Sequence, residues 1–188
     1  MTRADSSMIP LGTIAPDFKL FEPASNQWRT LADCAGEQGT LVIFICNHCP
    51  YVQQYNEELA QLGRDYLSRG IGIVAINSND IEAYPDDAPD KMVLEVEKHA
   101  YSFPYLYDET QQIARAYQAQ CTPDFFLFNR SLACVYRGRL DDATPGNSKP
   151  VTGIDLRTAM ESLLTGVDIA SEQSPSMGCS IKWKKGSI

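Results

Sequence analysis

Four short apolar runs, each bounded by turn residues, dominate the hydrophobic pattern of the chain. They cover residues 41–45, 71–76, 125–128 and 133–136. Runs of about four to eight aliphatic and aromatic residues between turn signals are typical of buried strands. Because only "NRS" and its flanks separate the last two runs, we expect them to form an antiparallel hairpin that closes one side of a sheet.

Helical periodicity fills the segments between these runs. In residues 50–70 the apolar side chains recur at intervals of three and four, and Gly70 supplies a stop. The periodic positions are Val52, Tyr55, Leu59, Leu62 and Tyr66. Further helices are predicted within residues 88–102, 109–118 and 153–166. Alternating strands and helices predict an α/β fold whose mixed sheet is covered on both faces.

The two ends of the chain have a different pattern. Turn signals such as "EPASNQ" in the first 40 residues predict an added hairpin. Residues 167–188 are polar and rich in turn residues, so we expect a tail without a further element. We therefore predict one domain over residues 1–166 and a C-terminal tail over residues 167–188. The acidic loop at residues 77–90 and His99 are both expected to be solvated.

Composition narrows the function classes. The chain has 188 residues and a formal charge of −8, which repels phosphate backbones and anionic lipid. No nucleic-acid or membrane partner is therefore expected. The N-terminus has no apolar run of signal-peptide length, and no segment approaches the ~20 apolar residues that span a bilayer. These features predict a cytoplasmic protein. The six cysteines are too sparse for a disulfide scaffold.

The stretch "LVIFICNHCPYV" contains two cysteines with different expected environments. Pro50 suits the first position of a helix, which places Cys49 at the N-cap and leaves Cys46 at the end of the strand or in the loop. A thiolate at a helix N-terminus is stabilised by unpaired N–H groups and the helix dipole, and a protonated His48 would add to this. We expect Cys49 to be partly exposed and the most reactive thiol. Cys34 and Cys134 fit the alternative of small buried hydrophobes.

Several motifs together resemble a known family. "LVIFICNHCPYV" is similar to the active-site strand, loop and helix of the thioredoxin superfamily, and "GTIAPDFKL" resembles the opening of its redoxin branch, the AhpC/TSA group. "CNHCPYV", "CTPDFFLF", "YRGRLDD" and "PSMGCSIKWK" together are similar to a group of peroxiredoxin-like proteins of the thioredoxin fold. The resemblance covers about residues 12–184. It implies a thioredoxin-like fold and a cis peptide bond between Thr122 and Pro123.

The resemblance also assigns a register to the cysteines. It places Cys49 on the nucleophilic cysteine of the thioredoxin motif and Val52 on the resolving cysteine. Peroxiredoxins have their peroxidatic cysteine at the position of Val52, within a Pro-x-x-x-Thr/Ser-x-x-Cys frame that this sequence lacks. We therefore expect measurable thiol-disulfide exchange but weak or absent peroxidase turnover.

The partner of Cys49 stays open at this point. Cys46 is close in sequence, and the resemblance places Cys121 near Cys49 in space, so both are candidate catalytic thiols of equal weight. Cys179, expected in a mobile tail, is a weaker candidate. The predicted substrate-binding residues are His48, Pro50, Thr122 and Pro123.

Three function classes remain. The first is a thiol-disulfide oxidoreductase, or thiol-dependent reductase, acting on protein or small-molecule disulfides and thiols. An atypical peroxiredoxin-like antioxidant is its closest alternative. The others are a metal-binding module that uses Cys46, His48 and Cys49, and a non-catalytic adaptor that binds extended peptides beside Pro123. We predict no cofactor and no resident metal. The sequence leaves the oligomeric state open.

Overall fold

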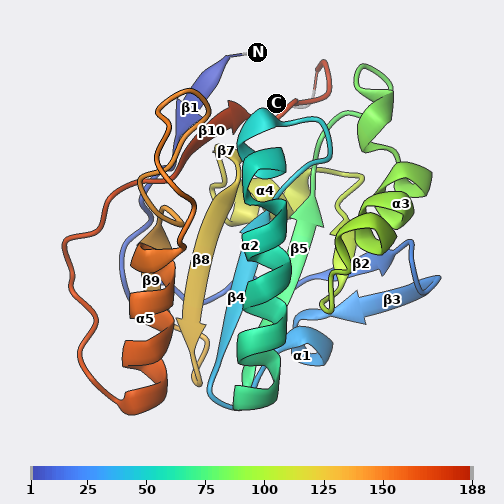
Figure 1. Ribbon diagram of the computed structural model, residues 1–188. Coiled ribbons are helices and arrows are strands. Elements are labelled where there is room, and N and C mark those ends of the chain that lie inside the picture. Colours follow the sequence, from blue (N-terminus) through green and yellow to red (C-terminus); the bar gives the residue numbers. More distant parts are fainter. Residues whose placement is uncertain (1, 187–188) are drawn as a thin grey trace.

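A seven-stranded mixed sheet forms the centre of the computed structural model, which describes residues 2–186 (Figure 1). Its strand order is β3-β2-β6-β5-β4-β8-β9. The strands are β2 (Lys19–Glu22), β3 (Gln27–Thr30), β4 (Gly39–Phe44), β5 (Ile71–Asn77), β6 (Tyr105–Tyr107), β8 (Asp124–Asn129) and β9 (Cys134–Gly138). Strands β4, β5 and β6 run parallel, whereas the pairs at both sides are antiparallel. The predicted α/β thioredoxin-like fold is confirmed.

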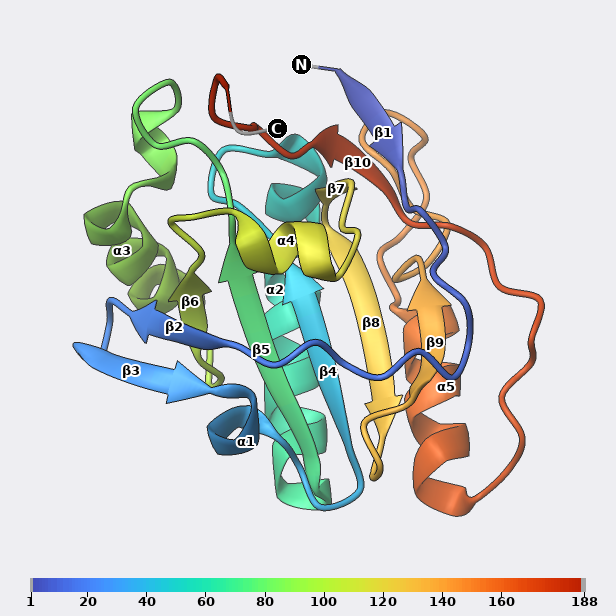
Figure 2. The same ribbon diagram turned by 180° about the vertical axis from the view of Figure 1, so that it is seen from behind.

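Helices cover both faces of this sheet. The first face carries α2 (Pro50–Tyr66), α3 (Pro89–His99) and α5 (Ile154–Thr165). The second face carries α4 (Gln112–Ala116) and the N-terminal segment that crosses the sheet (Figure 2). A short α1 (Leu31–Cys34) precedes β4, and 3-10 turns lie at Leu67–Arg69 and Pro85–Asp87. Among the described residues, no helix has the length and apolarity needed to cross a bilayer.

The hydrophobic pattern located most of these elements. All five periodic positions of α2 are buried, and Gly70 ends the following turn with a φ of +87°. The predicted N-terminal hairpin is β2 and β3, and the predicted hairpin around "NRS" is β8 and β9. The short strand β6 was not predicted, because three residues are too few to show a periodicity.

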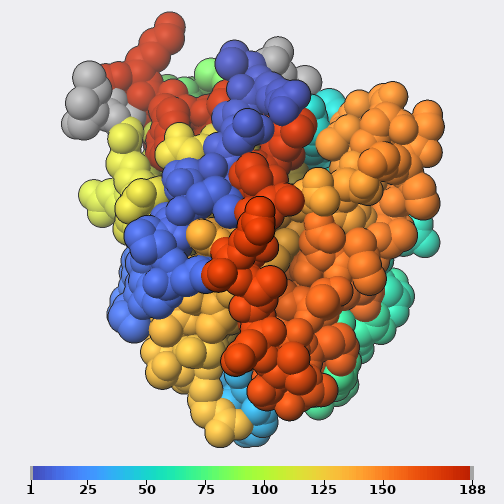
Figure 3. Space-filling view, turned by 90° about the vertical axis from the view of Figure 1, so that its left-hand side faces the viewer, coloured from blue at the N-terminus to red at the C-terminus, as the bar shows by residue number. Residues whose placement is uncertain are grey.

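The prediction that the C-terminal tail adds no element is wrong. Strand β10 (Met177–Ser180) lies between β1 (Arg3–Asp5) and β7 (Cys121–Thr122) in a separate three-stranded sheet. The tail runs back across the molecule beside the N-terminal segment before it reaches this sheet (Figure 3). Polar and glycine-containing strands lack the apolar run on which a strand prediction depends. The pairing partners, which are far away in sequence, fix β10 instead.

The acidic loop is also less solvated than expected. Its end is as predicted, since Pro89 opens α3. However, Asp87 is fully buried, together with Asn77 and Asn79. Asn77 ends β5 and the other two residues follow it. The carboxyl ends of the parallel strands bring the loop against the segment that follows β4. His99 is likewise only partly exposed, and its Nε2 lies 2.9 Å from Asn56 Nδ2 and 3.0 Å from Glu95 Oε2.

Candidate active site

The start of α2 positions Cys49 as predicted. Cys49 is the N-cap residue, with extended φ and ψ of −75° and 121°, and Pro50 occupies the first helical turn. Strand β4 ends at Phe44, so a five-residue segment connects the central strand to the helix. Cys46 lies in this segment, at the edge where the parallel strands end. The N-terminus of α2 therefore lies next to Cys49, although the Cys49 side chain makes no capping hydrogen bond.

The expected partial exposure of Cys49 is wrong. Its exposed fraction is 0%, and those of Cys46, Cys121 and Cys179 are 1%, 0% and 4%. Strand β10, which pairs with β7, lies across the N-terminus of α2. The segment that was expected to be a mobile tail thus covers the nucleophile.

Hydrogen bonding from neighbouring thiols favours the ionised form of Cys49. The largest cause is the thiol of Cys46, and the thiol of Cys179 and the backbone N–H of Val52 act in the same direction. Together they outweigh burial and lower the pKa of Cys49 to about 5. When protonated, the same sulfur donates a hydrogen bond to the carbonyl oxygen of Thr122, at 3.1 Å. These interactions favour the thiolate of Cys49 at neutral pH.

Cys46 and Cys179 are donors to this thiolate, and both stay protonated. Burial and the hydrogen bond with Cys49 raise the pKa of Cys46 well above that of an ordinary thiol. The same two causes raise the pKa of Cys179 to about 12. Cys46 also lies 3.3 Å from the hydroxyl of Thr122 and 3.9 Å from His48 Nδ1. One thiolate held by two neutral thiols is a suitable arrangement for disulfide chemistry.

The loop before β8 forms the opposite wall. The peptide bond between Thr122 and Pro123 is cis, which confirms the prediction. Thr122 presents its carbonyl oxygen to Cys49 and its hydroxyl to Cys46. Thr122 is thus in contact with both cysteines of the motif.

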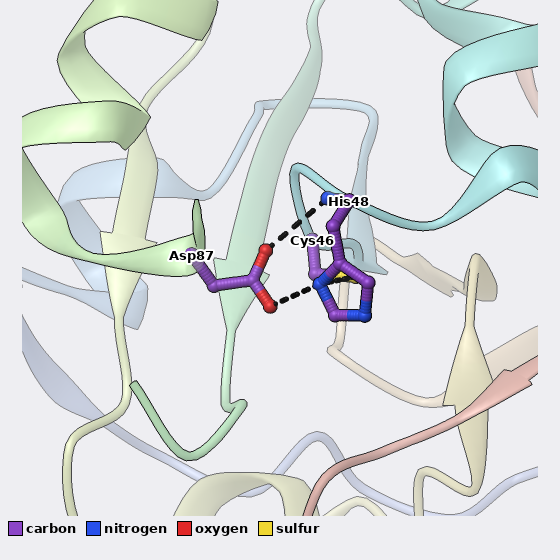
Figure 4. Close-up of side chains that lie close together, drawn as sticks. All are labelled: Cys46, His48 and Asp87. Atoms are coloured by element: carbon purple, nitrogen blue, oxygen red, sulfur yellow. Dashed lines mark hydrogen bonds and ion pairs between the residues drawn. The ribbon is translucent and has the colours of Figure 1, made fainter. Parts of the chain in front are cut away.

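A histidine and a buried carboxylate hold the segment between the two cysteines (Figure 4). His48 Nδ1 lies 2.6 Å from Asp87 Oδ2, while Asp87 Oδ1 accepts from the backbone N–H groups of Asn47 and His48. The hydrogen bond to Asp87 raises the pKa of His48. Hydrogen bonds from His48 and Asn79 hold the pKa of Asp87 below its usual value despite burial. The ring of His48 also stacks on Tyr84, with centroids 5.1 Å apart.

Among the described residues, one group of side chains could hold a metal ion. It consists of Cys46, His48 and Asp87. One donor atom from each lies within 4.8 Å of the others. Asp87, however, already accepts four hydrogen bonds from N–H groups, two on each oxygen, with the imidazole counted among the donors. A metal would have to displace the bond between His48 and Asp87. The arrangement is therefore better explained as a hydrogen-bonded support for the loop.

Cys121 has a different environment from the other two candidate partners. Its thiol lies 3.5 Å from the carbonyl oxygen of Pro123 and 4.0 Å from that of Ser176. Burial raises its pKa strongly. A thiol that donates to backbone carbonyls is typical of a packing cysteine. The assignment of Cys121 as a catalytic partner stays a prediction that this geometry does not favour.

The sequence analysis missed two carboxyl groups near the cysteines. Asp87 was assigned to a solvated loop, although its place after a buried parallel strand was a usable signal. Asp124 directly follows Pro123 and pairs with Phe44 at the end of β4. Burial raises the pKa of Asp124 to about 7. A lone acid at the start of the apolar run "FFLF" was the available signal.

Cys34 and Cys134 lie away from this group, as predicted. Both are buried in the cluster on the second face of the sheet. Burial raises the pKa of Cys34 to about 12 and that of Cys134 to about 11. Both are buried neutral thiols, so they can serve as controls in experiments on the cysteines near Cys49.

Comparison with known proteins extends this description. Residues 11–136 match the AhpC/TSA family, which is more than half of the chain. The chain belongs to the AhpC/TSA family. This AhpC/TSA protein has the thioredoxin fold, in agreement with the resemblance found in its sequence. The comparison with curated proteins gave no match.

Two solved structures are similar to the AhpC/TSA protein over nearly its whole length. It is 49% identical, with a TM-score of 0.97, to an uncharacterized conserved protein from Geobacillus kaustophilus, over 99% of this chain and 98% of that one. It is 47% identical, with a TM-score of 0.94, to a hypothetical protein from Sinorhizobium meliloti, over 97% and 99%. Peroxidoxin BcpB from Mycobacterium tuberculosis shares the fold at 13% identity and a TM-score of 0.61, over 85% and 98%.

Proposed function

We propose that the protein is a thiol-disulfide oxidoreductase in which Cys49 is the nucleophile. The observation that carries the proposal is the stabilised Cys49 thiolate at the start of α2, with its pKa lowered to about 5 by neighbouring hydrogen-bond donors. A thiolate attacks a disulfide sulfur, and a mixed disulfide with the substrate forms. A second thiol of the chain then releases the product.

The substrates of this proposal are disulfides and thiols of proteins or small molecules. Because Cys49 is fully buried, β10 has to move before a substrate sulfur can approach. Thr122, Pro123, Pro50 and His48 are the proposed substrate-binding residues. The proposed location is the cytoplasm, because sparse cysteines that form no disulfides suit a reducing compartment.

Peroxide reduction is expected to be weak. By resemblance to peroxiredoxins, the peroxidatic position is Val52, a buried hydrocarbon side chain in α2. A peroxide needs oriented donors for the charge that develops on its leaving oxygen. The carbonyl oxygen of Thr122 lies 3.1 Å from the Cys49 sulfur. This oxygen is an acceptor, so it would repel that charge.

The test compares Cys49→Ser with Cys134→Ser. Both replace a buried cysteine, but Cys134 lies in the cluster on the other face of the sheet. We expect Cys49→Ser to abolish exchange with a small mixed disulfide and Cys134→Ser to retain it. Retained exchange in Cys49→Ser, or rapid peroxide turnover in that variant, would contradict the proposal.

Metal analysis of the purified protein separates the proposed oxidoreductase from a metal-binding module. The proposal expects substoichiometric metal and six titratable thiols per chain under reducing conditions. A stoichiometric transition metal that is lost in Asp87→Asn would favour the metal site formed by Cys46, His48 and Asp87.

A further inference from the structure

The C-terminal strand β10 occupies the edge of β7, the strand that carries Thr122. It pairs antiparallel with β7, and the register places Cys179 opposite Thr122 and Ser180 opposite Cys121. Thr122 is also the residue whose carbonyl oxygen lies 3.1 Å from the Cys49 sulfur. The strand therefore brings its own cysteine next to the nucleophile, on the backbone that lines the site.

The thiols of Cys179 and Cys49 interact with each other. Its thiol hydrogen-bonds to Cys49, and each of the two groups shifts the pKa of the other. Cys179 is 4% exposed, so this contact is shielded from solvent. Lys182, three residues later in the chain, favours the ionised form of Cys179. Burial and the hydrogen bond with Cys49 outweigh this effect, so Cys179 is a protonated thiol beside Cys49.

Close backbone packing fixes this placement. A Cβ on Gly178 would lie 2.0 Å from the carbonyl oxygen of Thr122, so only glycine allows the strand to approach this closely. Ser176 adds a hydrogen bond of 2.7 Å from its hydroxyl to the carbonyl oxygen of Pro123. On the far side β1 pairs with β10 and places Ala4 opposite Gly178. The strand is held on both edges with its cysteine directed at Cys49.

Cys46 is less able to act as the resolving thiol. The segment between Cys46 and Cys49 is fixed by Asp87, which accepts from two of its backbone N–H groups and from His48 Nδ1. Bending this segment to bridge its two cysteines would break those bonds inside the protein, which is costly for a buried carboxylate. Residues 167–176, which precede β10, contain no helix or strand and place no comparable buried carboxylate on Cys179.

We propose that β10 is an internal substitute for the substrate strand and that Cys179 resolves the mixed disulfide formed at Cys49. This inference rests on the proposed function. The Cys49 thiolate first attacks a disulfide RSSR, forms Cys49–S–S–R and releases RS⁻. Cys179 then attacks the Cys49 sulfur, forms the Cys49–Cys179 disulfide and releases the second RS⁻. One RS⁻ takes up the proton that Cys179 loses and the other takes up a proton from solvent, so two thiols of the chain are oxidised and one disulfide is reduced.

The experiment uses the full-length reduced protein and oxidised glutathione as the disulfide. The reaction is stopped with acid, remaining thiols are alkylated, and disulfides are mapped by mass spectrometry. We expect a Cys49–Cys179 disulfide in the wild type and in Cys134→Ser, a control for a buried cysteine on the other face of the sheet. In Cys179→Ser, glutathione should accumulate on Cys49 and persist at least about tenfold longer, because intramolecular resolution is lost.

Two results would overturn this inference and leave the proposed function intact. One is a Cys46–Cys49 disulfide with Cys179 alkylated, and the other is accumulation of glutathione on Cys49 in Cys46→Ser but not in Cys179→Ser. Absence of glutathione on Cys49 in every variant would overturn the proposed function itself. Circular dichroism of Cys179→Ser, whose side chain differs by one atom, checks that the fold is retained.

Discussion

Among single residues, Cys46 has the largest effect on the ionisation of Cys49. Its hydrogen bond is the largest cause of the lowered pKa of Cys49. We expect Cys46→Ala to raise the pKa of Cys49 and to cut its thiolate fraction about tenfold at mildly acidic pH. Cys46→Ser should have a much smaller effect, because a hydroxyl still donates. Ultraviolet absorbance of the thiolate against pH measures this, and equal titrations for the two variants would contradict it.

Asp87 is the second residue whose role can be isolated. Replacement by Asn removes the charge that raises the pKa of His48 and leaves one acceptor for the backbone N–H groups. We expect Asp87→Asn to lower the pKa of His48, followed by NMR, and to reduce the free energy of unfolding by about 1–3 kcal/mol. Asp86→Asn, an exposed neighbour, is the control. An unchanged His48 titration in Asp87→Asn would refute the ion pair.

At the scale of elements, β10 controls access to the site. Gly178→Ala places a Cβ against the carbonyl oxygen of Thr122, which forces β10 away from β7. We expect alkylation of Cys49 in the reduced protein to become at least about tenfold faster, because the strand opens more often. The control is Ala170→Val, at an exposed position before β10. Alkylation at the wild-type rate in Gly178→Ala would mean that reagents reach Cys49 by another route.

At the scale of the whole molecule, the thiolate links stability to pH. The pKa of Cys49 is about 5 in the folded protein and about 8.5 for an unperturbed thiol. A lowered pKa contributes stability that is fully present above the unfolded value and is lost as pH falls through the folded value. The wild type should therefore lose stability relative to Cys49→Ser between about pH 8.5 and pH 5.

Urea unfolding of both proteins in reductant, at several pH values, measures this difference. His48 and Asp124 also have shifted pKa values and titrate in or near the same window, but both proteins contain them, so their contributions largely cancel. Parallel stability profiles for the two proteins would show that Cys49 is not a thiolate in the folded state.

Local sequence signals were sufficient to locate the framework of the site. Apolar runs identified the central strands, helical spacing identified α2, and Pro50 placed Cys49 at its N-cap, because these signals depend on neighbours within a few residues. The cis bond before Pro123 followed from a family resemblance, which also depends on a local motif.

Long-range packing defines which groups surround Cys49 and whether solvent reaches it. Asp87 and Cys179 come from segments about 40 and 130 residues away along the chain, and nothing local in their sequence shows where they pack. Strand β10 has no apolar run, since backbone pairing with β1 and β7 holds it rather than a hydrophobic face. Contacts between residues that are distant in sequence set this pairing. The surroundings of Cys49 therefore depend on long-range contacts as well.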